Sequence, residues 1–174
     1  IKSYEEGRIK IFFEVIQPGI DLLIFGGGFD AKPVTELANV LGWNVTVSDE
    51  CIAHLIPINF PKADQMVSCN RDYVAKKFDI SSFTAIVLMS HNLNYDKEVI
   101  MQIIESEASY IGILGPKNRA EKLIAHMEKN GIGITEEIRH KLHYPIGLDI
   151  GAETPDEIAV SIISEIQAKF TNRT

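Results

Sequence analysis

The sequence predicts an α/β fold in which helices cover both faces of a doubly wound, mostly parallel sheet. Apolar, β-forming stretches alternate with amphipathic helical stretches along most of its 174 residues. Several of the β-forming stretches are unbroken apolar runs, which suit strands buried on both faces of a parallel sheet. A glycine-rich turn, Gly26-Gly27-Gly28, joins the first such run to a helical pattern. Right-handed crossovers then place strands in this order within one sheet.

Length and composition indicate one globular domain without a membrane span. Of the residues, 45% are hydrophobic and 24% are charged, and no apolar run approaches the roughly 20 residues of a membrane helix. A net charge of −7 argues against a broad nucleic-acid surface, which needs clustered Lys and Arg. Cys51 and Cys69 form no C-x-x-C pair, so we expect free thiols and a cytoplasmic protein. The chain starts at Ile1 without Met or a secretory h-region, so we expect a fragment or a processed chain.

The first β-forming stretch, Arg8 to Ile16, lies ahead of the main alternation. It is rich in Ile, Phe and Val and is stopped by Pro18-Gly19, so it is predicted to be a strand. Such a strand would present an unpaired edge, which a second copy could cover. We therefore expect a homodimer.

A strand–helix–strand unit follows, with its elements predicted at residues 21–25, 31–41 and 43–47. Further strands are predicted at residues 65–69, 84–89 and 109–114. Further helices are predicted at residues 72–78, after Asn92 or Asn94, from Pro116 to Gly131, at residues 135–142, and from Pro155 onward. The last helix begins with a capping box, Thr154-Pro155-Asp156-Glu157.

The glycine turn carries a dinucleotide-binding fingerprint. Gly26, Gly28 and Ala31 fit G-x-G-x-x-G/A, in which the glycines allow a tight turn and close approach of a pyrophosphate to a helix N-terminus. Asp49 follows about 20 residues later, at a strand end, where this fold places a carboxylate against the adenosine ribose. Alternatively, Asp49 only ends a strand in a turn. Glu50 has no Arg or Lys beside it in the sequence and would repel the 2′-phosphate of NADP, so we expect NAD as the dinucleotide. The domain that holds it is expected to be Rossmann-like, with three layers in the order α/β/α.

Two further turns would border the same crevice, because ligands bind beyond the carboxyl ends of the strands. His91, within Ser90-His91-Asn92, is expected to contact a ligand or to act as an acid or base, or else to order its loop by a hydrogen bond. Gly115-Pro116 opens another helix, where Lys117 and Arg119 either pair with phosphates or are solvated. The predicted cofactor-binding residues are Gly26, Gly27, Gly28, Phe29, Ala31, Asp49, Ser90, His91 and Gly115.

Other polar residues give weaker signals. His140 and His143 lack a third ligand, so we predict no metal site. Asp149 stands in a glycine-flanked loop, where its carboxylate would point at a ligand or bond backbone amides. Because no complete set of acid, base and electrophile lies beside the crevice, we predict no catalytic residues.

Several motifs together resemble the carboxy-terminal Rossmann domain of the xanthine dehydrogenase accessory proteins, the XdhC/CoxI family. They are Gly26-Gly27-Gly28 with its helix, Ser90-His91-Asn92, Tyr110-Ile111-Gly112-Ile113-Leu114-Gly115, and the string from Gly147-Leu148-Asp149-Ile150-Gly151-Ala152 through Thr154-Pro155-Asp156-Glu157-Ile158-Ala159. Phe60-Pro61 with Ala63-Asp64 adds to the likeness, which covers the chain from about Asp21 onward. The resemblance implies a maturation role, in which a member binds molybdenum cofactor and helps deliver its sulfurated form to a molybdenum hydroxylase client.

This sequence also departs from the family pattern. The family's amino-terminal domain, which carries a cysteine associated with cofactor handling, is not in it. The resemblance implies that residues 1–20 are a linker strand from that domain and that residues 21–174 are the Rossmann-like domain. A basic residue usual after the second-strand acid is missing, with Cys51 in its neighbourhood, and Asn92 replaces the usual acid after the histidine.

We therefore expect an accessory protein that handles a cofactor, with NAD(H) or molybdenum cofactor as ligand, rather than an enzyme with turnover. Two other functions stay open. One is an NAD-dependent oxidoreductase with His91 as proton donor, and the other is a module that senses NAD and signals to a partner.

Overall fold

A parallel sheet organises the computed structural model, which describes residues 3–4, 7–8, 10–14 and 18–173. Within these residues the main sheet has six strands in the order β5-β4-β3-β6-β7-β8, and every neighbouring pair is parallel. The strands are β3 (Asp21–Phe25), β4 (Asn44–Asp49), β5 (Gln65–Ser68), β6 (Thr84–Leu88), β7 (Tyr110–Ile113) and β8 (Leu142–His143). The strand order reverses between β3 and β6, which confirms the predicted doubly wound sheet.

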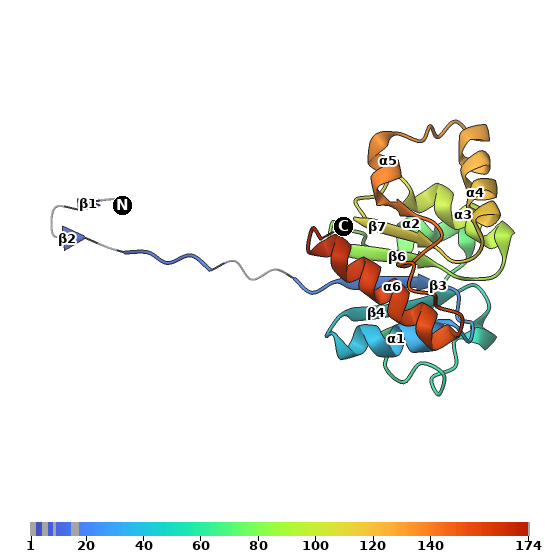
Figure 1. Cartoon of the computed structure of the whole chain (residues 1–174), viewed down its shortest axis with the longest axis horizontal. Coiled ribbons are helices and arrows are strands. Elements are labelled where there is room, and N and C mark those ends of the chain that lie inside the picture. The colour runs from blue at the N-terminus through green and yellow to red at the C-terminus, as the bar shows by residue number, and fades with distance from the viewer. Residues whose placement is uncertain (1–2, 5–6, 9, 15–17, 174) are drawn as a thin grey trace.

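Helices cover both faces of this sheet (Figure 1). Helices α1 and α6 pack together on one face, and α3 and α4 pack on the other. The helices are α1 (Ala31–Val40), α2 (Val74–Lys77), α3 (Leu93–Ile103), α4 (Lys117–Lys129), α5 (Glu136–Lys141) and α6 (Pro155–Phe170), with 3₁₀ turns η1 (Ile52–His54) and η2 (Arg71–Tyr73). None of the helices in the described residues has the length and apolar content needed to cross a membrane.

The unbroken apolar run of β3 feeds two separate cores. Leu22 and Ile24 pack in the cluster under α1 and α6, whereas Leu23 and Phe25 pack in the cluster under α3 and α4. Alternate side chains of a strand point to opposite faces, so each face must be apolar when both are covered. The sequence pattern therefore predicted the burial of this strand correctly.

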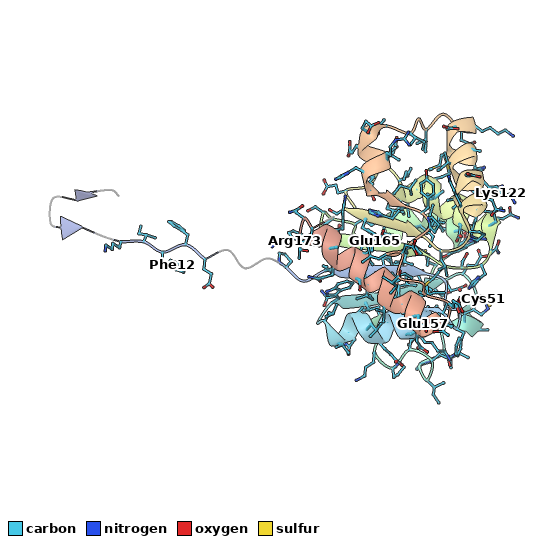
Figure 2. All side chains as sticks on the ribbon, viewed as in Figure 1. Phe12, Cys51, Lys122, Glu157, Glu165 and Arg173 are labelled. Atoms are coloured by element: carbon cyan, nitrogen blue, oxygen red, sulfur yellow. The ribbon has the colours of Figure 1, made fainter. Side chains whose placement is uncertain are left out.

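The prediction of a leading strand from Arg8 to Ile16 is wrong over residues 10–14, whereas Arg8 belongs to a strand. Residues 10–14 belong to no strand, and Ile11, Phe12 and Phe13 are 65%, 86% and 84% exposed. Ile9, Val15 and Ile16 lie outside the described residues. β1 (Ser3–Tyr4) and β2 (Gly7–Arg8) form a short antiparallel pair instead. A strand needs a neighbour for its backbone groups, and the described chain offers residues 10–14 none; Figure 2 shows Phe12 away from the main body.

Smaller differences occur at element ends. The helix predicted at residues 72–78 is a 3₁₀ turn followed by the single turn α2, and Pro116 is the N-cap of α4 rather than its first residue. The two-residue strand β8 was not predicted, because two residues are too few to show the alternation of apolar and polar side chains that marks a strand. The capping box of α6 is confirmed: the Glu157 N–H donates to Thr154 Oγ1 at 3.3 Å, and the Thr154 N–H donates to Glu157 Oε2 at 3.0 Å.

Candidate functional site

The glycine turn lies at the point where the strand order reverses, between the ends of β3 and β6. Gly26 has φ +123°, which L side chains rarely adopt, and its N–H donates to the Ser48 carbonyl at 2.8 Å. A Cβ at Gly26 would lie 2.6 Å from backbone atoms of Met89 and Ser90. Glycine is therefore required here both by the backbone conformation and by the close approach of the loop after β6.

Asp49 ends β4 beside this turn, as the sequence predicted, but its carboxylate already has protein partners. Its Oδ2 accepts from the Gly27 N–H at 2.9 Å, and its Oδ1 accepts from the Cys51 N–H at 2.8 Å. His54 Nδ1 also lies 2.9 Å from Oδ2. The Asp49 side chain is only 9% exposed, so these bonds offset the cost of burying its charge.

His54 was not singled out from the sequence, yet it covers the turn. Its side chain is 55% exposed and reaches Asp49 from η1. A Cβ at Gly27 would lie 3.0 Å from His54 Cβ and 3.1 Å from the His54 carbonyl oxygen. Residues 51–64 carry no clear period, so only the order Asp49, then His54 five residues later, could have suggested this contact.

His91 lies on the other side of the glycine turn. It has φ +57°, its side chain is 63% exposed, and its Nε2 lies 3.0 Å from Asp30 Oδ2. A Cβ at Gly28 would be 3.7 Å from His91 Cδ2. The loop-ordering hydrogen bond, one of the two alternatives for His91, is therefore present, and it joins the loops after β3 and β6. The exposed imidazole stays within reach of a ligand.

The neighbourhood of Glu50 corrects one expectation. Arg71 donates from Nε to Glu50 Oε2 at 2.7 Å, and a second bond joins Arg71 Nη2 to Glu50 Oε1. This contact raises the pKa of Arg71 and pairs its positive charge with the carboxylate of Glu50. The expectation that no Arg or Lys lies near Glu50 is therefore wrong, because the fold brings Arg71 of η2, 21 residues further along the chain, into contact with it. Repulsion of a 2′-phosphate by Glu50 is weaker than the sequence suggested.

Ser90 and Arg119 face inward rather than toward the crevice. Ser90 Oγ donates to Asp96 Oδ1 at 2.5 Å, and Arg119 Nη2 donates to Asp96 Oδ2 at 2.6 Å. Asp96 is fully buried, and burial raises the pKa of its carboxyl group while the bonds from Ser90 and Arg119 act in the opposite direction. Gly115, at φ +116°, lets Arg119 pass close to the backbone. Ser90, Arg119 and Gly115 thus fasten the loops after β6 and β7 to α3.

The remaining predicted residues of the turn differ in exposure. Ala31 is fully buried, in keeping with close packing of α1 on the sheet, whereas Phe29 is 69% exposed. Lys32 Nζ lies 5.2 Å from the Phe29 ring centroid and donates to Asn59 Oδ1 at 2.8 Å, so it ties the start of α1 to the loop after β4. Ile52 and Ile58 in that loop are 75% and 84% exposed. The loop after β4 therefore exposes apolar side chains and is tied to the start of α1.

The string from Gly147 to Ala152 lies in the loop between β8 and α6 and docks that helix. Ser161 Oγ donates to the Leu148 carbonyl at 2.6 Å, and a Cβ at Gly147 would lie 2.3 Å from Ser161 Oγ. Asp149 is exposed, and in the described part of the chain its carboxylate accepts neither a backbone nor a side-chain hydrogen bond. The proposed bonding of backbone amides by Asp149 is not seen.

A buried polar cluster behind this loop was also missed. Glu165 accepts hydrogen bonds from the Tyr110 hydroxyl and, at 2.9 Å, from the Gly147 N–H, and His143 Nδ1 lies 3.3 Å from its other oxygen. Burial and the nearby Glu165 charge raise the pKa of Tyr110. The cluster joins β7 and β8 to α6, on the face of the sheet that α6 shares with α1.

A hollow lies elsewhere in the described part of the chain, and its polar groups do not converge on one point. It has a volume of about 790 Å³ at the amino ends of the strands, between Trp43, Phe83 and Phe170. Its ammonium groups are already engaged, since Lys141 donates to the Ser106 carbonyl at 2.7 Å and Lys169 donates to the His140 carbonyl at 2.9 Å. We therefore take the glycine crevice as the candidate site. Among the described residues, no group of three or more His, Cys, Asp or Glu side chains could hold a metal ion.

The reversed strand order, the glycine turn and Asp49 define a Rossmann-type α/β domain. The chain matches the XdhC Rossmann domain over residues 22–166, and it belongs to that family. It is 33% identical over 157 residues to a protein of Bacillus subtilis named as a probable xanthine dehydrogenase subunit, covering 90% of this chain and 45% of that protein. It is 23% identical over 155 residues to the molybdenum cofactor insertion chaperone PaoD of Escherichia coli, covering 88% of this chain and 42% of PaoD.

The same likeness extends to a solved structure. A crystal structure described as a xanthine dehydrogenase from Bacillus halodurans has a TM-score of 0.79 to this chain at 30% identity, over 90% of this chain and 44% of that one. The chain thus spans less than half the length of each of these three proteins.

Proposed function

We propose that this chain is the nucleotide- or cofactor-holding domain of an accessory protein that matures a molybdenum hydroxylase of the xanthine dehydrogenase type. The observation that carries the proposal is the turn at Gly26, against which the loop after β6 packs closely. This turn lies where the strand order reverses, in a domain of the XdhC family. The name of the Escherichia coli relative, an insertion chaperone for molybdenum cofactor, supports the delivery role. The client would be the molybdenum hydroxylase that receives the cofactor.

The residues of the crevice fit the phosphate that NAD and the pyranopterin of molybdenum cofactor share. The N-cap of α1, Asp30, makes no side-chain bond to the helix start. In the part of the chain that the structure describes, the N–H groups of Gly28 and Phe29 have no protein acceptor either. Unpaired N–H groups at the positive end of a helix dipole bind phosphate oxygens. These groups would hold the phosphate, and His91 would approach it from the opposite loop.

Asp49 would receive the ribose of a nucleotide, and NAD stays our favoured dinucleotide. Glu50 adds a second carboxylate at the end of β4, although its pairing with Arg71 reduces the discrimination against NADP. When bound, molybdenum cofactor would supply the metal-centred chemistry of the client enzyme. The chain itself would bind, orient and release its ligand, with Gly26, Gly27, Gly28, Phe29, Ala31, Asp49 and His91 forming the site and Ser90 and Gly115 supporting its loops.

Calorimetric titration of the full-length protein with molybdenum cofactor and with NAD tests this proposal. We expect binding of at least one of them, and we expect Asp49→Asn to weaken nucleotide binding about tenfold, because it removes a charged acceptor. Asp149→Asn is the matched control, since Asp149 is exposed and lies in another loop. If neither ligand binds, the proposal fails.

Residues 1–20 are proposed to connect this domain to a preceding one. The matched relatives are more than twice as long as the part they share with this chain, and Ile11, Phe12 and Phe13 are too exposed for isolated surface residues. A second copy of the chain is the other partner proposed for this segment. Light scattering of Phe12→Asp and Phe13→Asp variants separates the two, because only a dimer interface in this segment predicts a drop in mass.

An NAD-dependent oxidoreductase remains a second candidate because the exposed His91 imidazole lies next to Gly28. A His91→Ala variant that binds NAD normally, together with no hydride transfer by the unmodified protein on a panel of substrates, would rule against it. An NAD-sensing module would instead change its mass or partner affinity on binding without turnover.

A further inference from the structure

We propose that His54 takes the place of a ligand hydroxyl at Asp49, and that a ribose enters the crevice by displacing this imidazole. The inference rests on the proposed nucleotide binding and adds to it a residue that decides which ligands bind and how tightly. The ligand class is a nucleotide with both its 2′- and 3′-hydroxyls.

The first argument concerns how many hydrogen bonds the Asp49 carboxylate can accept. An ionised carboxylate offers about four acceptor positions, and Gly27, Cys51 and His54 already use three of them. About one position remains, which is too few for the two hydroxyls of a ribose. When His54 leaves, about two positions are open, and they match the vicinal diol.

The identity of the three donors shows which one leaves. Gly27 and Cys51 donate from the backbone, and moving them would distort the glycine turn or the end of β4. His54 donates from a side chain that is 55% exposed, so water can replace its bond at little cost. Since an ionised carboxylate only accepts, His54 Nδ1 carries the proton in this pair.

The position of His54 gives the displacement a second effect. Its Cβ and carbonyl group lie against Gly27, within 3.0 to 3.2 Å of where a Cβ would be. The segment that holds it is a single 3₁₀ turn, Ile52–His54, with no buried residue. The closed loop therefore covers both the carboxylate and the turn that would hold the phosphates, and few packing contacts oppose its opening.

The test compares ADP with 2′-deoxy-ADP by calorimetry on the unmodified chain and on His54→Ala. We expect His54→Ala to bind ADP about fivefold more tightly, the ratio that corresponds to about 1 kcal/mol for an exposed pair. 2′-Deoxy-ADP has one ribose hydroxyl, for which Asp49 already has an acceptor position, so its affinity should change by less than about twofold. His54→Asn keeps a short side-chain donor and should restore the original ADP affinity.

His140→Ala is the matched control, because His140 is an exposed histidine in α5 and lies outside the proposed site. We expect no gain in ADP affinity from it. The inference is overturned by weaker ADP binding in His54→Ala, by an equal gain for both nucleotides, or by no binding of ADP to either form. Binding of molybdenum cofactor and activation of a client enzyme are measured separately. The maturation role can therefore fail while His54→Ala still changes the affinity for ADP more than that for 2′-deoxy-ADP, and the maturation role can hold when this difference is absent.

Discussion

Replacing Gly26 with alanine tests whether the crevice is built as described. At φ +123° an L residue is strained by roughly 1–3 kcal/mol. The new Cβ would also lie 2.6 Å from the Met89 carbonyl group and from Ser90 Cα, all backbone atoms that no rotamer change can move away. Overpacking of this kind costs roughly 1–3 kcal/mol. The two terms together predict a loss of about 4 kcal/mol in the free energy of unfolding.

Two other glycines separate these terms. Gly42 has φ +75°, and a Cβ there would have nothing within 4 Å, so Gly42→Ala carries the strain without the clash. Gly28 has no positive φ, and the nearest neighbour of a Cβ there would be 3.7 Å away, so Gly28→Ala carries neither. We expect losses of about 1 kcal/mol and about zero, because alanine also lowers the entropy of the unfolded chain.

Urea unfolding followed by circular dichroism measures all three variants under the same conditions. A loss of about 4 kcal/mol would lower the melting temperature by about 8 to 16 °C in a domain of this size. If Gly26→Ala is no less stable than Gly42→Ala, the loop after β6 does not press on the glycine turn, and the reasoning about the crevice is refuted.

Three further predictions concern the crevice rim and α6. Gly28→Ala should keep its stability but weaken ADP binding at least tenfold, measured by calorimetry, because its methyl group would point toward His91 across the phosphate position. Backbone N–H bonds lower the pKa of Glu157 below its ordinary 4.5, so α6 should lose stability as the pH falls through that lowered value, and Glu157→Gln should remove this dependence in urea titrations at pH 3 to 6. Tyr110→Phe should cost about 2 kcal/mol in the same assay, since it removes a hydrogen bond to the charged Glu165.

Local patterns predicted most of the fold. The run Asp21–Phe25 was predicted as a two-sided strand because both faces of a covered parallel sheet must be apolar. The capping box before α6 is likewise a property of four consecutive residues. The same kind of reasoning failed at Ile11-Phe12-Phe13, because β-propensity describes fit to a half-buried pleated surface, and residues 10–14 have no such surface within the described chain.

The arrangement of residues around the glycine turn was predicted in part, and the contacts that were missed join distant segments of the chain. The order Gly26, Gly28, Ala31, Asp49 follows from the chain connectivity of one strand–helix–strand unit, so it could be read directly. The pairing of Glu50 with Arg71 joins loops after β4 and β5, which only the sheet brings together. Ser90 was predicted beside the ligand, but the buried carboxylate of Asp96 turns its hydroxyl inward.

Asp49 and His54 show how such a contact changes a functional interpretation. From the sequence, Asp49 was either a ribose ligand or the end of a strand in a turn. In the structure its carboxylate accepts the N–H groups of Gly27 and Cys51, contacts His54 and keeps about one acceptor position. A carboxylate in this state binds a diol only if a protein donor gives way. The side-chain donor is His54. If this imidazole leaves as we propose, the affinity for a nucleotide depends on a loop in which the sequence shows no period, and removing the imidazole should strengthen binding rather than weaken it.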